Sequence, residues 1–190
     1  MKFKRILAAF LSVLCLASCE EFLTEDPTTS LSEGTVYSNE ANLEAGVIGV
    51  YWSLKTSNYS WTTQMSEFCS FPSILIHWKD NRTAENYIQC LRLTMFPHSA
   101  ENQGLYDYLY ASIYKCNKMI EAMSISPVDQ AYKNEIEGEV KFIRAWQYFA
   151  AVRFWGDIPL ILNTPKNIDE TDAPRVHYVE VYKQILSDLE

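Results

Sequence analysis

The residues best suited to ligand chemistry form one short run, Trp78-Lys79-Asp80-Asn81-Arg82. A sugar ring has an apolar face and a polar edge, so a site for it combines a flat aromatic surface with amide, carboxylate or guanidinium partners. This run supplies both within five residues. The alternative is a core tryptophan beside a solvated turn, and the run alone does not separate the two interpretations.

No catalytic constellation accompanies this run. Glu135, Glu137 and Glu139 could supply the paired carboxylates of a glycoside hydrolase. Alternate positions on a helix point in different directions, however, so these carboxylates are predicted to form a solvated face. The three histidines are scattered, and the sequence lacks a His-x-x-x-His pair, a nucleophile elbow and a glycine-rich phosphate loop. We therefore expect no enzyme, no metal site and no cofactor.

The N-terminus has the regions of a secretory signal. Basic residues at positions 2, 4 and 5 precede an apolar run over 6–16, which is too short to span a bilayer. Ala17-Ser18-Cys19 follows and resembles a bacterial lipobox, in which the cysteine is acylated. The alternative is an ordinary signal peptide with a chance cysteine. We predict a signal peptide over 1–18, a lipid anchor on Cys19 and an acidic tether over 19–34.

The charge balance bears on partners. The chain carries 16 basic and 24 acidic side chains, a formal charge of −8. Removing residues 1–18 deletes three basic residues and leaves a charge of −11, which excludes nucleic acid as an expected partner. Cys69, Cys90 and Cys116 then remain in the body. Cys116 is predicted to lie in the core, while a Cys69–Cys90 disulfide stays open.

Hydrophobic residues at helical spacing predict four helices. They cover 39–55, 105–123, about 28 residues from Ser126 to Trp155, and a segment opening near Tyr178. Ser126 is expected to cap the third helix, and Gly156 and Pro159 to end it. Gly46 and Gly49 would allow close helix contact.

Each helix has an apolar stripe or face. In the third helix, 142–155 is apolar nearly all round, which predicts burial on several sides. Tyr106, Tyr110 and Tyr114 are expected to pack between helices, with a sugar platform as the alternative. The stripes at helical spacing are Leu43, Val47, Val50, Tyr51 and Leu54 in the first helix, Leu105, Leu109, Ser112, Cys116, Met119 and Met123 in the second, and Val179, Tyr182, Ile185, Leu186 and Leu189 in the fourth. If the chain is truncated, its last helices are expected to expose apolar stripes that pack against absent partners.

A long irregular excursion, 56–104, separates the first two helices. It holds Trp61 and Trp78, and stretches of this length are usually functional or disordered, with the aromatic residues arguing against disorder. Antiparallel helix pairs at the observed spacing are typical of the tetratricopeptide architecture. We expect an all-α fold of such pairs over 35–190. The last helical period reaches Glu190 without a stop signal, so we expect the natural polypeptide to continue.

Several longer motifs follow one another in order along the chain. They are a helix over 108–123, Gly138-Glu139-Val140-Lys141-Phe142-Ile143-Arg144-Ala145-Trp146-Gln147-Tyr148-Phe149, Trp155-Gly156-Asp157-Ile158-Pro159-Leu160, Pro174-Arg175, and the run 181–189. These motifs resemble the SusD/RagB family. With the lipobox, the resemblance covers nearly the whole chain. Arg144 and Asp157 could form a ligand pair, but a buried arginine and an aspartate satisfying backbone groups at the helix exit are preferred.

The resemblance implies a surface-exposed outer-membrane lipoprotein of the Bacteroidetes. Such a protein binds glycans, oligosaccharides or other nutrients and caps a SusC-like TonB-dependent barrel that imports them. Glycan-binding members carry a tryptophan followed three residues later by an asparagine, which Trp78 and Asn81 match; Arg82 and Trp61 are lesser candidates. The alternative function is a helical-repeat scaffold that binds protein partners without sugar.

Overall fold

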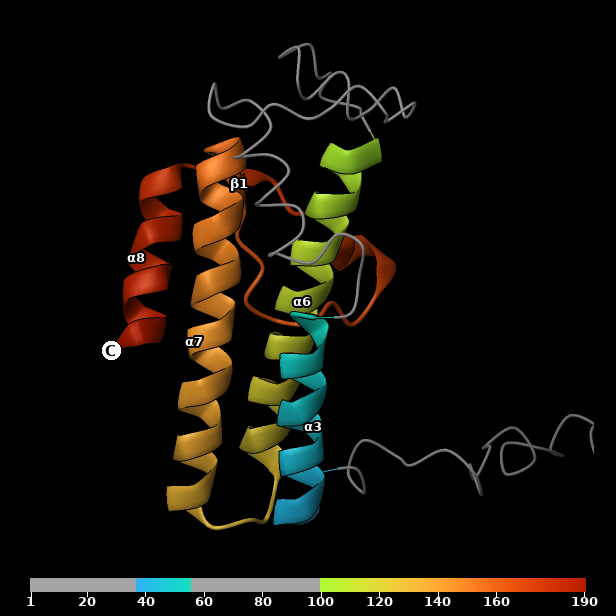
Figure 1. Cartoon of the computed structure of the whole chain (residues 1–190), viewed down its shortest axis with the longest axis vertical. Helices are drawn as coiled ribbons and strands as arrows, with labels where there is room; N and C mark the ends of the chain where they lie inside the picture. Colours follow the sequence, from blue (N-terminus) through green and yellow to red (C-terminus); the bar gives the residue numbers. More distant parts are fainter. Residues whose placement is uncertain (1–36, 56–99) are drawn as a thin grey trace, which may run out of the picture. The chain divides into compact units, whose positions relative to one another are not determined.

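A computed structural model of the chain describes residues 37–55 and 100–190, which form helices and one small sheet (Figure 1). The elements in chain order are α3 (Glu40–Ser53), α6 (Ala100–Ile125), α7 (Gln130–Trp155), β1 (Ile158–Pro159), the 3₁₀ helix η1 (Ile168–Thr171), β2 (Arg175–Val176) and α8 (Tyr178–Leu189). All four expected helices are confirmed. Residues 100–104, expected in the irregular excursion, instead form the first turn of α6.

The ends of the helices follow local rules. The Asn39 side chain caps α3 by accepting a hydrogen bond from the Asn42 N–H at 2.9 Å. Gly156 ends α7 with φ of 69°, a conformation that favours glycine. The prediction that Ser126 caps α7 was wrong. Asp129 is the cap, because its carboxylate accepts from the Ala131 N–H at 2.9 Å, whereas the Ser126 hydroxyl donates to the Tyr37 carbonyl.

Helix α7 is the centre of the described fold. It runs antiparallel to α6 and to α8, and it also packs against α3 (Figure 1). Its first half shares one core cluster with α3 and the second half of α6. Its second half shares another cluster with α8, β1 and the first half of α6. The short strands β1 and β2 pair antiparallel, with Ile158 opposite Val176, and bring the chain back to start α8.

Close packing of α3 on α6 depends on Gly46. A Cβ atom added there would stand 2.5 Å from Met119 Sδ, so the prediction of close contact is confirmed at this position. The same prediction for Gly49 was wrong, because a Cβ there would meet no described atom within 4 Å outside its own stretch of helix. Cys116 is fully buried in the same cluster, as expected.

The expected buried faces hold in α6 and fail in part elsewhere. All six residues of the α6 stripe are buried. Tyr51 of α3 and Tyr114 of α6 are exposed, while the Tyr106 ring packs against both Tyr110 and Trp155. Apolar residues of α7 that were predicted to be buried reach the surface, and so do most residues of the α8 stripe. They are Phe142, Trp146 and Phe149 in α7, and Val179, Tyr182, Leu186 and Leu189 in α8.

The buried face of α8 is built from Val181, Ile185 and Asp188 instead. Of the apolar stripe that the sequence identified on α8, Ile185 is buried, and Asp188 on the buried face is held by an ion pair from Arg144 of α7. In the part of the chain that the structure describes, no helix is long and apolar enough to cross a membrane, and no group of potential ligands could hold a metal ion.

Candidate functional site

The sequence-predicted ligand residues lie outside the described residues. Trp61, Trp78, Asn81 and Arg82 all fall in 56–99, and Cys19 falls in 1–36. The predicted signal peptide, the tether and the open Cys69–Cys90 pairing are likewise outside them. The structure therefore describes the helices that flank the excursion.

The helices on both sides of this excursion are joined by a buried hydroxyl pair. The Ser53 and Ser112 hydroxyl oxygens lie 2.9 Å apart and fix the end of α3 beside the middle of α6. Ser53 donates to the Val50 carbonyl at 2.6 Å, so Ser112 donates to Ser53 and accepts from Gln147 Nε2 at 3.1 Å. Helix α6 begins at Ala100, roughly 18 Å along the helix axis from Ser112 at a rise of 1.5 Å per residue.

Arg144 forms the principal buried polar network. Its Nε and Nη2 atoms donate to the two carboxylate oxygens of Asp188 at 2.8 and 2.6 Å, and Nη1 donates to Asn117 Oδ1 at 2.9 Å. Gln184 also donates to Asp188. This network joins α6, α7 and α8. The predicted structural role of Arg144 is thus confirmed.

Asp157 has a separate structural role. Its Oδ1 accepts from the Tyr178 N–H at 2.8 Å, which satisfies a backbone donor at the start of α8. Arg144 pairs with Asp188, so the alternative of an Arg144–Asp157 ligand pair does not apply. Sequence reasoning identified the arginine and missed its partner, which lies 44 residues away.

Residues 158–164, here called the strap, lie along one face of α6. Tyr110 donates to the Pro159 carbonyl at 2.7 Å, and Asn117 donates to the Ile161 carbonyl at 2.8 Å. Glu121 accepts from both the N–H and the hydroxyl of Thr164. Successive anchor positions on α6 are seven and four residues apart, which places them on one helix face.

Tyr148 of α7 fixes the strap from the other side. Its hydroxyl donates to the Ile161 carbonyl at 2.6 Å and accepts from the Ile161 N–H at 2.8 Å. Burial raises the pKa of Tyr148, and burial together with neighbouring Tyr106 raises the pKa of Tyr110. Both hydroxyls therefore stay protonated donors at neutral pH.

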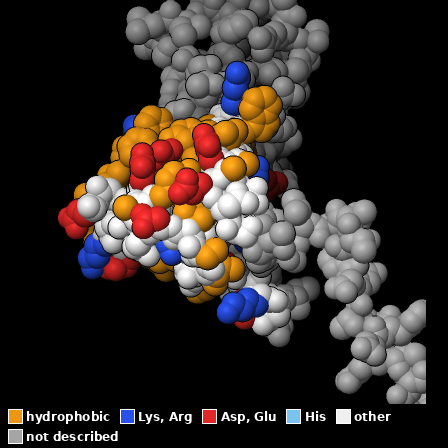
Figure 2. Space-filling view, turned by 90° about the horizontal axis from the view of Figure 1, so that it is seen from below, with side chains coloured by type: hydrophobic (Ala, Val, Ile, Leu, Met, Phe, Trp, Pro, Cys, Tyr) orange, Lys and Arg blue, Asp and Glu red, His pale blue; other side chains and the backbone are white. Residues whose placement is uncertain are grey.

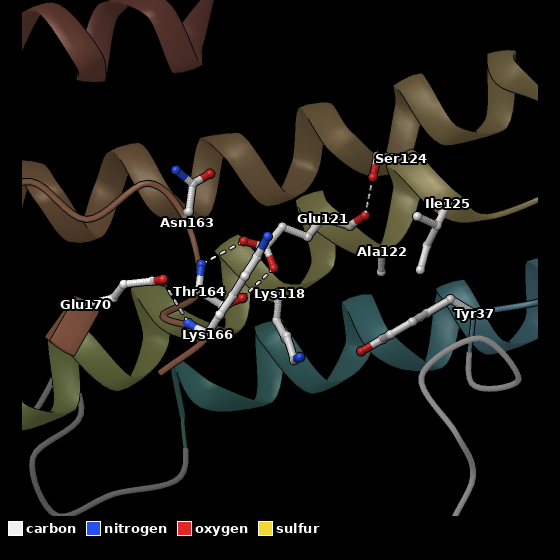
Figure 3. A pocket seen from close by; sticks show the side chains of 10 residues that line it. All are labelled: Tyr37, Lys118, Glu121, Ala122, Ser124, Ile125, Asn163, Thr164, Lys166 and Glu170. Atoms are coloured by element: carbon white, nitrogen blue, oxygen red, sulfur yellow. Dashed lines mark hydrogen bonds between the residues drawn. The ribbon is translucent and has the colours of Figure 1, made fainter. Parts of the chain in front are cut away.

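The strap and α6 form one wall of a cavity of about 620 Å³ (Figure 3). Figure 3 shows the Tyr37 hydroxyl and the Lys118 ammonium pointing toward one another, with Glu121 bound to Thr164 beside them. The full lining comprises Tyr37, Lys118, Glu121, Ala122, Ser124, Ile125, Asn163, Thr164, Lys166 and Glu170. Sequence analysis singled out none of these as ligand residues, because they come from separate segments and share no local motif.

The conspicuous carboxylates of α7 do not converge. Glu137 pairs with Lys141 at 2.7 Å on the same helix. Glu139 lies beside Tyr51, where burial and the hydrogen bond from the phenol to Glu139 raise the pKa of Tyr51. Glu135 is exposed. Their arrangement is the solvated face that the sequence predicted.

Comparison with known proteins decides the family. A SusD-like family model described as "Starch-binding associating with outer membrane" matches residues 21–190. The chain belongs to the SusD-like family. SusD-like protein P38 of Formosa agariphila is 26% identical over 203 residues, an alignment that covers 100% of this chain and 37% of that relative. The chain thus spans about a third of the length of such relatives.

Solved SusD-like structures share the fold. A SusD superfamily protein from Bacteroides vulgatus matches with a TM-score of 0.70 at 17% identity, covering 81% of this chain and 34% of the other. A laminarin binding SusD-like protein matches with a TM-score of 0.69 at 22% identity, covering 80% and 33%. The all-α, tetratricopeptide-like fold class that the sequence predicted is confirmed.

Proposed function

We propose that this SusD-like protein captures glycans at the outer membrane and does not transform them chemically. The observation that carries the proposal is the family match over 21–190, joined to a fold shared with a laminarin binding relative. The described residues supply a rigid helical support, with caps, packed clusters and a buried ion pair.

The ligand is proposed to bind the excursion, where Trp78 would offer an aromatic platform to a sugar face. Asn81 and Arg82 would donate hydrogen bonds to hydroxyl groups at the ring edge, and Trp61 would extend the platform. The aromatic and polar residue types between Trp78 and Arg82 support this proposal. The hydrogen bond between the Ser53 and Ser112 hydroxyls supports it as well, because it holds the two flanking helices together.

Anchoring is proposed to occur through acyl chains on Cys19 after removal of residues 1–18. Each buried methylene contributes about 0.8 kcal/mol, so several chains attach the protein stably to the bilayer. A surface position would place the glycan site beside a SusC-like TonB-dependent barrel, the proposed importing partner. The family description, which names association with the outer membrane, supports this placement.

A binding assay tests the glycan proposal. The purified full chain is titrated with starch-derived and laminarin-derived oligosaccharides, beside Trp78→Ala and the matched control Trp146→Ala. Trp146 lies exposed on α7, outside the proposed site. We expect the Trp78 variant to lose about fivefold to tenfold in affinity, since loss of one aromatic stacking contact removes about 1–1.4 kcal/mol of binding free energy. Equal loss in both variants would refute the platform.

The anchor has its own test. Cys19→Ala is expected to move the protein from the membrane fraction to the soluble fraction and to abolish incorporation of labelled palmitate. Cys15→Ala is the control, because it lies in the apolar run of the predicted signal. Unchanged fractionation of the Cys19 variant would refute lipidation there.

A second candidate function, protein interaction through the helical repeat, is favoured by the exposed apolar side chains. Phe142, Trp146 and Phe149 form one stripe on α7, and Tyr182, Leu186 and Leu189 form another on α8. The Phe149 and Tyr182 rings meet at 6.4 Å and join the stripes. Figure 2 shows hydrophobic side chains reaching the surface beside acidic ones. This surface is compatible with glycan capture at the excursion.

A further inference from the structure

We propose that the cavity between α6 and the strap is a second saccharide subsite, which takes an uncharged sugar ring. This inference rests on the proposed glycan-binding function and assigns it a further place, remote in sequence from Trp78. The ring would lie against Tyr37, and its hydroxyl groups would bind Asn163 and Lys166.

The carboxylates of the cavity are already held by the chain. Both oxygens of Glu121 accept hydrogen bonds from Thr164. Both oxygens of Glu170 also accept, one from the Lys166 backbone N–H at 2.9 Å and one from Asn167 at 2.8 Å. These groups shape the wall and keep lone pairs that can accept from sugar hydroxyls.

Two hydrogen-bond donors of the cavity are available to a ligand. Among the described residues, the Lys166 ammonium forms no ion pair and the Asn163 side-chain amide has no hydrogen-bond partner. Both side chains are exposed. A polyhydroxylated ligand can accept hydrogen bonds from both of these groups.

The charge of the cavity decides the class of ligand. Two lysines and two glutamates line it, so its formal charge is zero in a chain of −8. A phosphate or a carboxylate would meet the two glutamates, and a cation would meet the two lysines. A neutral saccharide avoids both repulsions and uses donors and acceptors together.

The cavity is preformed, because its walls are fixed independently of a ligand. Thr164 is tied to α6 through Glu121, and Ile161 is tied to α6 and α7 through Asn117 and Tyr148. Tyr37 is held in place because its carbonyl accepts from the Ser126 hydroxyl at 2.7 Å. Preformed walls reduce the entropy that binding must overcome.

Nuclear magnetic resonance on the full chain tests the subsite, with maltotriose and laminaritriose as probes. We expect one of these sugars to shift the Asn163 side-chain amide and the Thr164 backbone amide. The shifts are expected to persist in Trp78→Ala. In Asn163→Ala and Lys166→Ala, the affinity reported by the Thr164 amide is expected to fall about tenfold. Lys183→Ala, on the exposed face of α8, is the control and should leave it unchanged.

The outcomes separate the two proposals. Sugar binding that Trp78→Ala abolishes, with no shift at Asn163 or Thr164, would overturn the second subsite and leave the proposed function standing. If the wild-type chain binds no glycan in this test or in the oligosaccharide titration described above, both proposals are overturned. Thr164 shifts that Lys166→Ala and Asn163→Ala leave unaltered would also overturn the subsite.

Discussion

Arg144 is the one buried basic side chain among the described residues. It lies where the two core clusters of α7 meet, and its three hydrogen bonds reach Asp188 and Asn117. A buried ion pair need not add net stability compared with apolar residues of the same volume, because both charges lose their hydration. Removing one partner is different, since it leaves the other charge buried and uncompensated.

We therefore expect Arg144→Ala to lower the free energy of unfolding by about 3–5 kcal/mol in urea denaturation. The matched control is Lys183→Ala, which removes an exposed ion pair to Glu180 and should leave the unfolding free energy nearly unchanged. If both variants unfold at the same urea concentration, the Arg144 network does not hold α8 in place.

Cys116 offers a second prediction at this scale. Burial raises the pKa of the Cys116 thiol from 9.0 to about 12. Because the thiolate is the reactive form, we expect Cys116 to resist N-ethylmaleimide at pH 8 in the folded protein and to react in urea. Since the raised pKa belongs to the folded state, its contribution to stability is present below about pH 9 and is lost as the pH rises toward 12. Peptide mass mapping after labelling checks this, and rapid labelling without urea would contradict it.

At the scale of elements, the position of the strap depends more on the Tyr148 hydroxyl than on the strand that the strap itself forms. Its two-residue strand gives little support, whereas Tyr148 both donates to and accepts from Ile161. The strap in turn supplies Asn163 and Thr164 to the cavity. Loss of this hydroxyl should therefore loosen the cavity wall while leaving the helices in place.

We expect Tyr148→Phe to lower the unfolding free energy by about 1–3 kcal/mol, because the half-buried Ile161 N–H loses its acceptor. Hydrogen exchange should show faster exchange at the Ile161 amide, with little change in the α6 amides. Tyr114→Phe, at an exposed position of α6, is the control. Unchanged protection of Ile161 would show that other contacts hold the strap.

Sequence reasoning succeeded for elements whose signals are local. The hydrophobic period of α6 predicted its buried stripe, although the helix begins five residues earlier than predicted, and the glycine that ends α7 gave a bound that the structure confirms. It failed at the N-cap of α7, because Ser126 and Asp129 both have side chains that can cap a helix. The Ser126 hydroxyl instead donates a hydrogen bond to the Tyr37 carbonyl. Sequence reasoning did not predict that Asp188 is buried, since that burial depends on the ion pair with Arg144 of another helix.

At the scale of the whole molecule, sites also differ in whether their residues are close in sequence or are brought together only by the fold. The predicted ligand residues form a local motif, Trp78 to Arg82, which sequence alone can find, and they remain a prediction. The cavity beside α6 unites Tyr37, Lys118 and Lys166, which are separated by up to 129 positions. Only the packing of the strap on α6 brings them together, so no spacing rule could have identified them.

The apolar stripes of α7 and α8 follow from this organisation as well. The inward faces of α7 and α8 already pack in the core clusters and are joined by the Arg144–Asp188 pair. On their outer faces, Trp146 is 44% exposed and Leu186 is 60% exposed. Contiguous exposed apolar surface is a usual sign of a partner surface or of association. Helical-repeat units hide such surface by stacking against a neighbour.

We expect the purified chain to self-associate through these stripes as its concentration rises. Trp146→Glu combined with Leu186→Glu should shift sedimentation toward the monomer, because charges on both helices oppose burial of the surface. Lys115→Glu, at an exposed position of α6, is the control for added negative charge. A chain that sediments as a monomer at every concentration would show that the stripes do not drive self-association, and the helical-repeat interaction proposal would then need a different partner for this face.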